Sequence, residues 1–258
     1  MFYRGIDEGK VISQEEISDG IFSLLIENKG AKAANPGQFA GIFPNSKDTL
    51  LMRPISICET KDNATRFVYR VAGKGTKEFS SLKEGDTVRV LANLGNGFPI
   101  EEAEGKCVVL MGGGIGIPPM LGVAKALKGN DVHSFLGYRN KDTFLSDEFM
   151  QYSKVYLASE DGSIGVKGNV LDALRASIYL KPDIIMACGP MPMLRAIKKY
   201  AEENGIKAYI SLEERMACGI GACLGCVCKT VKKDDHSNVN NRRICTEGPV
   251  FDAEEVDI

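Results

Sequence analysis

The pattern of apolar residues changes near residue 101, and this change constrains the fold more than any other feature of the chain. Before it, short runs rich in β-branched and aromatic residues are separated by turn-rich pieces such as ENKG, NPG and KEGD. Strands at such regular spacing are typical of a small closed barrel, in which closure removes exposed strand edges. We therefore predict a six-stranded antiparallel barrel over residues 1–102. Its strands are expected in KVISQEEI, IFSLLIE, QFAGIFP, LLMRPISICE, TRFVYRVA and DTVRVLA.

After the acidic stretch EEAEG at 101–105, fully apolar runs alternate with segments of helical spacing. The expected strands are KCVVLMGGG, DVHSFLGYR, KVYLASED, PDIIMACGP and AYISLEER, and the expected helices are IPPMLGVAKALKG, VLDALRAS and MPMLRAIKKYAEENG. Alternating strands and helices predict a doubly wound parallel sheet, here over residues 103–211. The remainder, residues 212–258, holds most of the cysteines and is predicted to be a small C-terminal subdomain.

Composition limits the class of protein. The chain has 258 residues, 44% of them hydrophobic and 26% charged, with a net charge of −2. This balance gives no basic surface for nucleic acid or anionic lipid. The first residues, MFYRGIDEGKVIS, lack the apolar centre of a signal peptide, and no stretch reaches the roughly 18 apolar residues of a membrane span. We expect a soluble cytoplasmic protein, in whose reducing compartment eight cysteines do not form a disulfide framework.

The cysteines predict a metal cluster. Cys218, Cys223 and Cys226 follow the order C-x4-C-x2-C, and Cys245 comes after 18 further residues. This is the ligand order of a plant-type [2Fe–2S] site. A zinc site with four cysteine ligands is the alternative, although zinc sites favour paired C-x2-C motifs and Cys245 has no close neighbour. Cys228 is expected to be a bystander, because the alternating strand VCKTV turns it away from Cys226.

The remaining cysteines and histidines point to packing rather than chemistry. Cys58 and Cys107 lie in apolar, strand-like runs and are expected to be buried. His133 lies in a strand pattern and His236 in a polar loop, so each is expected to be structural or solvated. A metal site rich in histidine is excluded.

The glycine-rich stretch GGGIGIPP, at 112–119, lies between a strand and a helix. Such a turn brings free backbone N–H groups and the positive end of a helix dipole close to a pyrophosphate, and we expect Gly114 and Gly116 there. The stretch departs from G-x-G-x-x-G, and the next strand ends in GYRN without an acidic residue for a ribose. The alternative is a turn that only packs a helix on the sheet. Arg139 either meets a 2′-phosphate or lies on a solvated loop, so NAD and NADP both remain open.

Two segments of the barrel half have residues suited to a phosphate. In RPIS, Arg53 can clamp a phosphate while Ser56 hydrogen-bonds a ring. In YRVAGKGT, Gly73, Gly75 and Thr76 can form a second phosphate-binding turn. Taken singly, both segments also fit ordinary strand ends.

Together, RPIS, GGGIGIPP and ACGPMPM resemble the ferredoxin–NADP reductase superfamily over residues 1 to about 211. The resemblance implies FAD in the barrel and a nicotinamide dinucleotide in the α/β domain. It implies that Arg53 meets the flavin pyrophosphate and that Ser56 sits near the reactive flavin nitrogen. The implied flavin contacts are Arg53, Pro54, Ile55, Ser56, Tyr69, Arg70, Val71, Gly75 and Thr76. Many relatives have a stacking Tyr where this chain has Ile55.

The same resemblance puts Cys188 and Gly189 beside the nicotinamide. Cys188 then either shapes the pocket or acts directly as a thiolate, and it is counted with Ser56 as a candidate catalytic residue.

The tail narrows the resemblance. SLEERMACGIGACLGCVCK and RRICTEGPVFDAEEV resemble the electron-transfer subunits of type B dihydroorotate dehydrogenase, and Cys218 replaces the Asp of several cousins. That family implies a heterotetramer of two chains with two FMN-containing catalytic subunits, and electron flow from dihydroorotate through [2Fe–2S] and FAD to NAD+ in pyrimidine biosynthesis. Two alternatives remain. One is an NAD(P)H-dependent iron–sulfur flavoprotein reductase serving a ferredoxin, a sulfide or NADP oxidoreductase partner, or an oxygenase. The other is a zinc-binding interaction protein.

Overall fold

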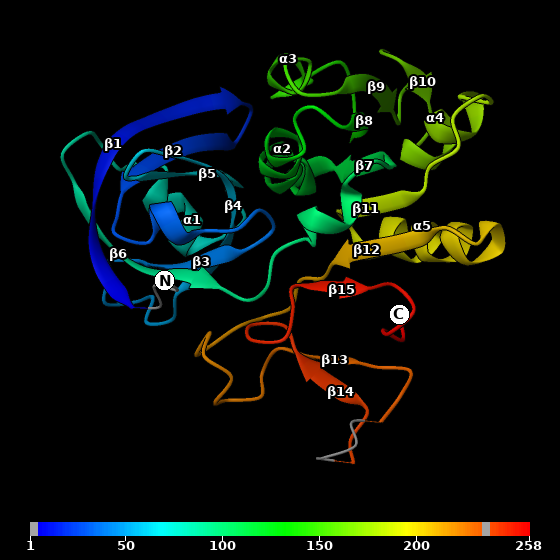
Figure 1. The fold of residues 1–258 in the computed structure, drawn as a ribbon. Helices are drawn as coiled ribbons and strands as arrows, with labels where there is room; N and C mark the ends of the chain where they lie inside the picture. The colour runs from blue at the N-terminus through cyan, green and yellow to red at the C-terminus, as the bar shows by residue number, and fades with distance from the viewer. Residues whose placement is uncertain (1–4, 234–237) are drawn as a thin grey trace.

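The computed structural model describes residues 5–233 and 238–258 and confirms the predicted fold class. Figure 1 shows a barrel in blue and cyan, an α/β domain in green and yellow, and a C-terminal region in orange and red that lies below both. His236 lies outside the described residues.

The barrel forms as the strand pattern predicts. Its strands are β1 (Ile6–Ser18), β2 (Ile21–Glu27), β3 (Phe39–Phe43), β4 (Arg53–Lys61), β5 (Ala64–Arg70) and β6 (Thr87–Leu94). They close in the order β1-β2-β5-β4-β3-β6, with every neighbouring pair antiparallel. The short segment η1 (Ala31–Ala33) and the helix α1 (Lys74–Phe79) cover the barrel, and Phe79 packs edge-on against Tyr69 in its core.

The α/β domain is a sheet in the order β10-β9-β8-β7-β11-β12-β15. Its parallel strands are β7 (Cys107–Gly113), β8 (Asp131–Tyr138), β9 (Lys154–Ser159), β10 (Val166–Lys167), β11 (Ile184–Cys188) and β12 (Lys207–Ser211). The connections hold η2 (Ile100–Ala103), η3 (Gly114–Gly116), α2 (Ile117–Ala126), α3 (Ser146–Phe149), α4 (Val170–Ala176) and α5 (Met191–Asn204). Alternate residues of the central strands pack against α2 on one face and against α4 and α5 on the other. The sheet is therefore doubly wound.

The C-terminal region is joined to this sheet. Its strand β15 (Val250–Asp252) pairs antiparallel with β12, with Phe251 opposite Ile210. The strands β13 (Val227–Lys229) and β14 (Asn241–Arg243) form a separate antiparallel pair. In the part of the chain that the structure describes, no helix has the length and apolar character needed to cross a membrane.

Ion pairs and close packing join the barrel to the α/β domain. Arg66 on β5 donates to Glu148 on α3 at 2.6 Å and to Glu59 on β4 at 2.9 Å, and Lys125 on α2 reaches Glu59 at 3.0 Å. A Cβ atom on Gly122 of α2 would lie 2.5 Å from the carbonyl oxygen of Cys58, so a larger residue there would push the two domains apart. These contacts fix the barrel against the sheet, and Cys58 is buried as predicted.

Candidate functional site

One edge of the barrel is open to a ligand. β4 begins at Arg53 and its antiparallel neighbour β5 ends at Arg70, so both arginines lie at the same edge. The first four residues of β4, 53–56, are all half-exposed, whereas Ile57 and Cys58 are buried. Since a barrel strand normally alternates between inward and outward residues, a run that is open throughout marks a surface where other atoms can pack.

The charges at this edge suit an anion. Within the described residues, neither Arg53 nor Arg70 forms an ion pair. A Cβ atom on Gly75 would lie 2.6 Å from Arg53 Nε, so the first turn of α1 packs directly on this guanidinium. Thr76 Oγ1 accepts hydrogen bonds from the backbone N–H of Ala72 at 2.9 Å and from that of Gly73 at 3.1 Å. These bonds fix the turn at the start of α1. The edge therefore fits the pyrophosphate of a flavin dinucleotide.

The other expected flavin contacts differ in what they offer a ligand. Tyr69 is only 2% exposed, its hydroxyl accepts a hydrogen bond from Gln14 at 2.8 Å, and burial raises its pKa to about 12. Its side chain thus belongs to the barrel core, and its backbone is what remains for a ligand. Ile55 and Val71 are half-buried apolar residues that pack against the barrel core, and Pro54 is half-exposed on β4.

The switch point of the α/β sheet, which we call the crevice, lies at the carboxyl ends of β7 and β11. The chain leaves β7 for β8 on one side, while β11 pairs with β7 on the other side. Open α/β sheets bind ligands at such a switch point. Gly114, with φ of +53°, opens the turn, and a Cβ atom there would lie 3.8 Å from Arg70 Nη2. The crevice and the barrel edge are therefore contiguous.

Gly116 is the point of closest approach within this crevice. A Cβ atom there would collide with the carbonyl group of Cys188 and would lie 2.7 Å from the Cα atom of Gly189. Only glycine lets the start of α2 approach the end of β11 this closely. The structure thus brings Gly114, Gly116, Cys188 and Gly189 together.

This packing predicts unequal effects for two alanine substitutions. Gly116→Ala is expected to destabilise the chain by about 3 kcal/mol or more, at or beyond the upper end of the usual overpacking range, because rigid backbone stands where the new methyl group must go. Gly114→Ala has open space and should cost about 1–2 kcal/mol for the left-handed backbone alone. Urea unfolding of both variants measures the difference in free energy. An equal or smaller loss in Gly116→Ala would contradict the packing described above.

Cys188 is a poor candidate for thiolate chemistry. Burial raises the pKa of its thiol to about 12, against a hydrogen bond with Ser211 that lowers it. The thiol is therefore protonated at neutral pH and a weak nucleophile. This favours the pocket-shaping role over direct attack.

Four cysteines of the C-terminal region form two pairs. The outer pair is Cys218 and Cys223, in which the backbone N–H of Cys223 donates to Cys218 Sγ at 3.4 Å. Burial opposes the Cys218 thiolate, but backbone N–H groups of residues 220, 223 and 222 outweigh it and lower its pKa to about 6. The inner pair is Cys226 and Cys245, each 2% exposed, where burial and the neighbouring Cys226 thiol raise the pKa of Cys245 to about 11.

The spacing of these sulfur atoms bears on the choice of metal. One zinc ion held by four thiolates at about 2.3 Å would bring every pair of sulfurs within roughly 4 Å. In the described ranges, however, the one group of at least three ligand atoms mutually within 4.8 Å is Cys107, Asp131 and His133. Two separate thiol pairs suit two irons better than one zinc.

Cys228 lies apart from these pairs. It is on β13 opposite Arg242, and it packs half-buried against the hydrophobic core of the α/β domain. Burial raises the pKa of its thiol.

The cysteine loop packs on the barrel beside Arg53. A Cβ atom on Gly219 would collide with Met52 Cε and would lie 3.2 Å from Leu94 Cδ1. Met52, which is 2% exposed, directly precedes Arg53. The backbone N–H of Asn96 also donates to the carbonyl of Gly248 at 2.6 Å. Sequence reasoning missed Met52, because an apolar residue before a strand gives no signal of its partner.

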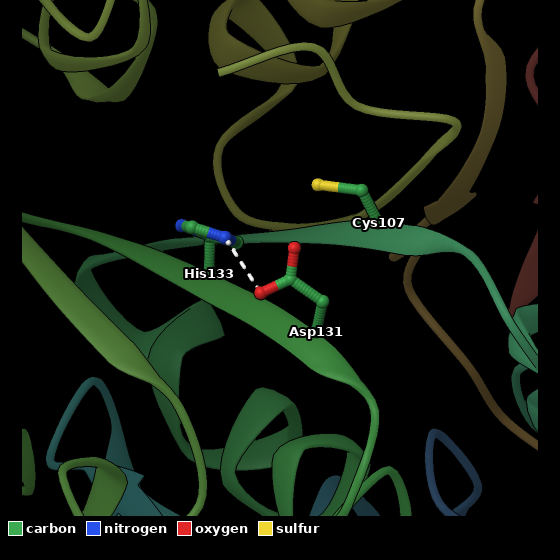
Figure 2. A group of neighbouring side chains, drawn as sticks. All are labelled: Cys107, Asp131 and His133. Carbon is green, nitrogen blue, oxygen red and sulfur yellow. Dashed lines mark hydrogen bonds and ion pairs between the residues drawn. The ribbon is translucent and has the colours of Figure 1, made fainter. Parts of the chain in front are cut away.

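The group of Cys107, Asp131 and His133 is a different arrangement (Figure 2). His133 Nε2 lies 3.2 Å from Asp131 Oδ1, and His133 Nδ1 lies 3.1 Å from the Tyr156 hydroxyl. Lys154 Nζ also reaches Asp131 at 3.2 Å. These side chains form hydrogen bonds and ion pairs with one another. They lie near the amino ends of β7 and β8, away from the crevice. This agrees with a structural His133.

Comparisons with known proteins agree with this arrangement. The family model of the iron–sulfur cluster binding domain of dihydroorotate dehydrogenase B matches residues 213–257, and that of the oxidoreductase NAD-binding domain matches residues 110–199. The electron transfer subunit of dihydroorotate dehydrogenase B (NAD(+)) from Listeria monocytogenes is 44% identical over 96% of this chain and 98% of its own length. That from Caldanaerobacter subterraneus is 41% identical over 96% and 97%.

Solved structures show the same fold. The NADH-dependent reduced ferredoxin-NADP oxidoreductase has a chain that aligns with a TM-score of 0.85 and 33% identity, over 98% of this chain and 91% of its own. A ferredoxin NADP+ reductase from Neisseria gonorrhoeae with bound FAD and NADP aligns with a TM-score of 0.65 and 15% identity, over 81% and 94%.

Fold and site together define an oxidoreductase of the ferredoxin–NADP reductase type that has an NAD-binding domain and an iron–sulfur cluster binding domain. Within that class, the chain belongs to the family of electron transfer subunits of dihydroorotate dehydrogenase B.

Proposed function

We propose that this chain takes electrons from an FMN-containing catalytic subunit that oxidises dihydroorotate and delivers them to NAD+. The observation that carries the proposal is the continuity of three sites. Gly219 of the cysteine loop packs on Met52, Arg53 follows directly, and Arg70 of the same barrel edge lies beside Gly114 of the crevice. Electrons that enter at the loop thus have a short path to the crevice. The names of the relatives supply the donor, dihydroorotate.

The proposed binding residues follow from the geometry. The two thiol pairs, Cys218 with Cys223 and Cys226 with Cys245, each suit one iron of a [2Fe–2S] cluster. The barrel edge and the switch-point crevice suit FAD and NAD+ respectively. When bound, FAD supplies the exchange between the two-electron chemistry of a nicotinamide and the one-electron chemistry of an iron–sulfur cluster.

The residues of this chain bind and orient these groups. Arg53, with the first turn of α1 against it, neutralises a pyrophosphate, and Ser56 offers a hydroxyl further along the open run of β4. Gly116 and Gly189 close the crevice tightly, and Ser211 holds the neutral thiol of Cys188. We propose that this packing limits the access of water to the reacting face.

We also propose that the partner binds beside Cys223. Ile220 (61% exposed) and Leu224 (61%) flank this exposed cysteine in the sequence, and Leu50 (84%) and Leu51 (51%) directly precede Met52; we call these four exposed apolar residues the loop patch. The patch has one part in the barrel, next to Met52, and one part in the cysteine loop, next to Gly219. The contact between Met52 and Gly219 joins the two segments that carry these parts. Exposed apolar groups that gather at one place mark interaction surfaces. The proposed assembly is a heterotetramer of two chains of each kind, in which the loop patch is buried.

The proposed setting is the cytoplasm, as a step of pyrimidine biosynthesis. All eight cysteines are free thiols, which suits a reducing compartment.

A reductase that serves a ferredoxin is the second candidate. The alignment with NADH-dependent reduced ferredoxin-NADP oxidoreductase favours it. Purification from the native cell, with identification of the bound subunit, separates the two: a dihydroorotate-oxidising flavoprotein supports the first, and a ferredoxin-linked partner supports the second.

The four cysteines can be tested individually. Iron and acid-labile sulfide should each approach two per chain, as a [2Fe–2S] cluster requires. Cys→Ser at position 218, 223, 226 or 245 should remove the rhombic electron paramagnetic resonance signal of the reduced protein. Cys228→Ser is the matched control and should keep it, since Cys228 lies on β13 opposite Arg242 and belongs to neither thiol pair. About one zinc per chain without sulfide would end this assignment.

A further inference from the structure

A tight turn after β14 carries the last cysteine of the chain. The carbonyl of Arg243 accepts hydrogen bonds from the N–H groups of Thr246 at 3.2 Å and of Glu247 at 2.8 Å. Arg243 Nε also donates to the Glu247 carboxylate at 2.8 Å, and the N–H of Ile244 donates to the carbonyl of Cys226 at 2.8 Å. These bonds hold residue 246 in a fixed place beside the inner thiol pair.

The hydroxyl oxygen of Thr246 is buried and has no hydrogen-bond partner among the described residues. The other buried side-chain atoms of this kind lie in the barrel: Gln14 Oε1, Asn28 Oδ1, Thr49 Oγ1 and Asn93 Oδ1. Three of these four are amide oxygens, which accept hydrogen bonds and cannot donate them. The Thr246 hydroxyl has a proton to donate, and a buried donor without an acceptor is unfavourable. This hydroxyl therefore suits an acceptor that the described residues do not supply.

The Thr246 hydroxyl lies next to the backbone that contacts the Cys245 thiol. A Cβ atom on Gly221 would lie 3.3 Å from Thr246 Oγ1 and 3.6 Å from Arg243 Nη1, and a guanidinium can only donate hydrogen bonds. Burial and the neighbouring Cys226 thiol raise the pKa of the Cys245 thiol to about 11, while a hydrogen bond from the Gly221 backbone opposes this rise. Gly221 is thus adjacent to both the hydroxyl and the thiol, which brings the hydroxyl to the inner edge of the cysteine site.

We propose that the Thr246 hydroxyl donates a hydrogen bond to a sulfur atom of the cluster and thereby raises the reduction potential of the cluster. Hydrogen bonds to sulfur are one of the means by which a protein sets this potential. The reduced cluster carries one more negative charge than the oxidised cluster, so a donor stabilises the reduced state more. Thr246 tunes the electron carrier and does not bind iron. The inference rests on the proposed cluster site at the four cysteines.

The test compares Thr246→Val and Thr246→Ser with the wild-type holoprotein, which contains FAD and cluster. Valine removes the hydroxyl, serine keeps it, and neither substitution changes a charge. A redox titration followed by the electron paramagnetic resonance signal of the reduced cluster measures the midpoint potential. Thr246→Val should lower the equilibrium constant for one-electron reduction about tenfold, which corresponds to about 59 mV, and Thr246→Ser should stay within about twofold of wild type. Thr246→Ala should match Thr246→Val and takes its place if the valine variant does not retain the cluster.

Thr230→Val is the matched control. Thr230 also has a buried side chain in the C-terminal region, but its hydroxyl donates to the carbonyl of Lys232 at 2.8 Å, so its loss should leave the potential unchanged. If the hydroxyl-free variants at position 246 keep the equilibrium constant within about twofold, or if Thr230→Val lowers it equally, the role of Thr246 is overturned while the cluster site stands. If wild type contains zinc without iron and sulfide, the cluster assignment falls and this inference falls with it.

Discussion

Replacing Cys223 by Ala is expected to reduce NAD+-linked dihydroorotate oxidation, with the catalytic partner present, by at least about a hundredfold. In the same variant, NADH oxidation by ferricyanide should stay within about threefold of wild type. The reason is geometric. Cys223 lies in the cysteine loop, whereas the barrel edge at Arg53 and the crevice at Gly114 are built from other segments. Only the link between the two half-reactions should be lost. Both rates are measured spectrophotometrically on matched amounts of flavin-loaded protein.

Cys223 is the best of the proposed ligands to remove because it is exposed, whereas Cys226 and Cys245 are buried in the core. Cys228→Ser should preserve both activities and controls for the loss of a thiol. Undiminished coupling in Cys223→Ala after cluster loss is shown by iron analysis would refute the proposed electron path. So would NAD+-linked dihydroorotate oxidation by this chain without a partner.

Truncation at Ser211 is a less discriminating experiment than the segment boundaries suggest. The proposed domains are residues 1–102, 103–211 and 212–258, yet β15 of the last segment pairs with β12 of the middle one. Removing the tail therefore exposes an edge strand and uncovers Ile210, besides removing the thiols. A point substitution leaves this packing intact.

The sequence predicts the strands and helices that repeat a strong pattern. IFSLLIE and MPMLRAIKKYAEENG form β2 and α5 within a residue of their expected limits, because local apolar spacing decides which face is buried. It does not predict β15, which has three residues and is a strand only because β12 offers it an edge. Nor does it predict α1, whose segment KGTKEF contains a glycine that would weaken a helix elsewhere.

The same distinction, between local patterns and contacts of distant segments, applies to the candidate site. Cysteine spacing and the glycine-rich turn are local signals that can be read from the chain. The approach of Gly219 to Met52, and of Gly116 to Cys188, joins segments far apart in sequence. Each depends on the absence of a side chain, and a glycine in the sequence does not indicate which distant segment approaches it. Such contacts decide how the three sites meet, and they come only from the folded chain.

Arg53→Ala is expected to weaken FAD binding by roughly ten- to hundredfold. The substitution removes a charge-assisted hydrogen bond to phosphate, which contributes on the order of 1.5–3 kcal/mol, and each 1.4 kcal/mol or so corresponds to a factor of ten. The structure strengthens this expectation, since the half-exposed Arg53 forms no ion pair among the described residues and α1 packs against it through Gly75. FAD affinity is measured by fluorescence titration of the flavin-free protein.

Arg53→Lys and Arg89→Ala make the Arg53 result specific. Arg53→Lys keeps the charge but loses the planar fork, so it should recover only part of the affinity. Arg89 is another barrel arginine, on β6, whose guanidinium lies over the Phe43 ring at 4.9 Å, and its loss should leave FAD affinity within about twofold. Wild-type affinity in Arg53→Ala, or FMN as the extracted flavin, would contradict the assignment of this edge. Equal losses in Arg53→Ala and Arg89→Ala would instead mean that general barrel stability, and not a phosphate contact at Arg53, controls flavin retention.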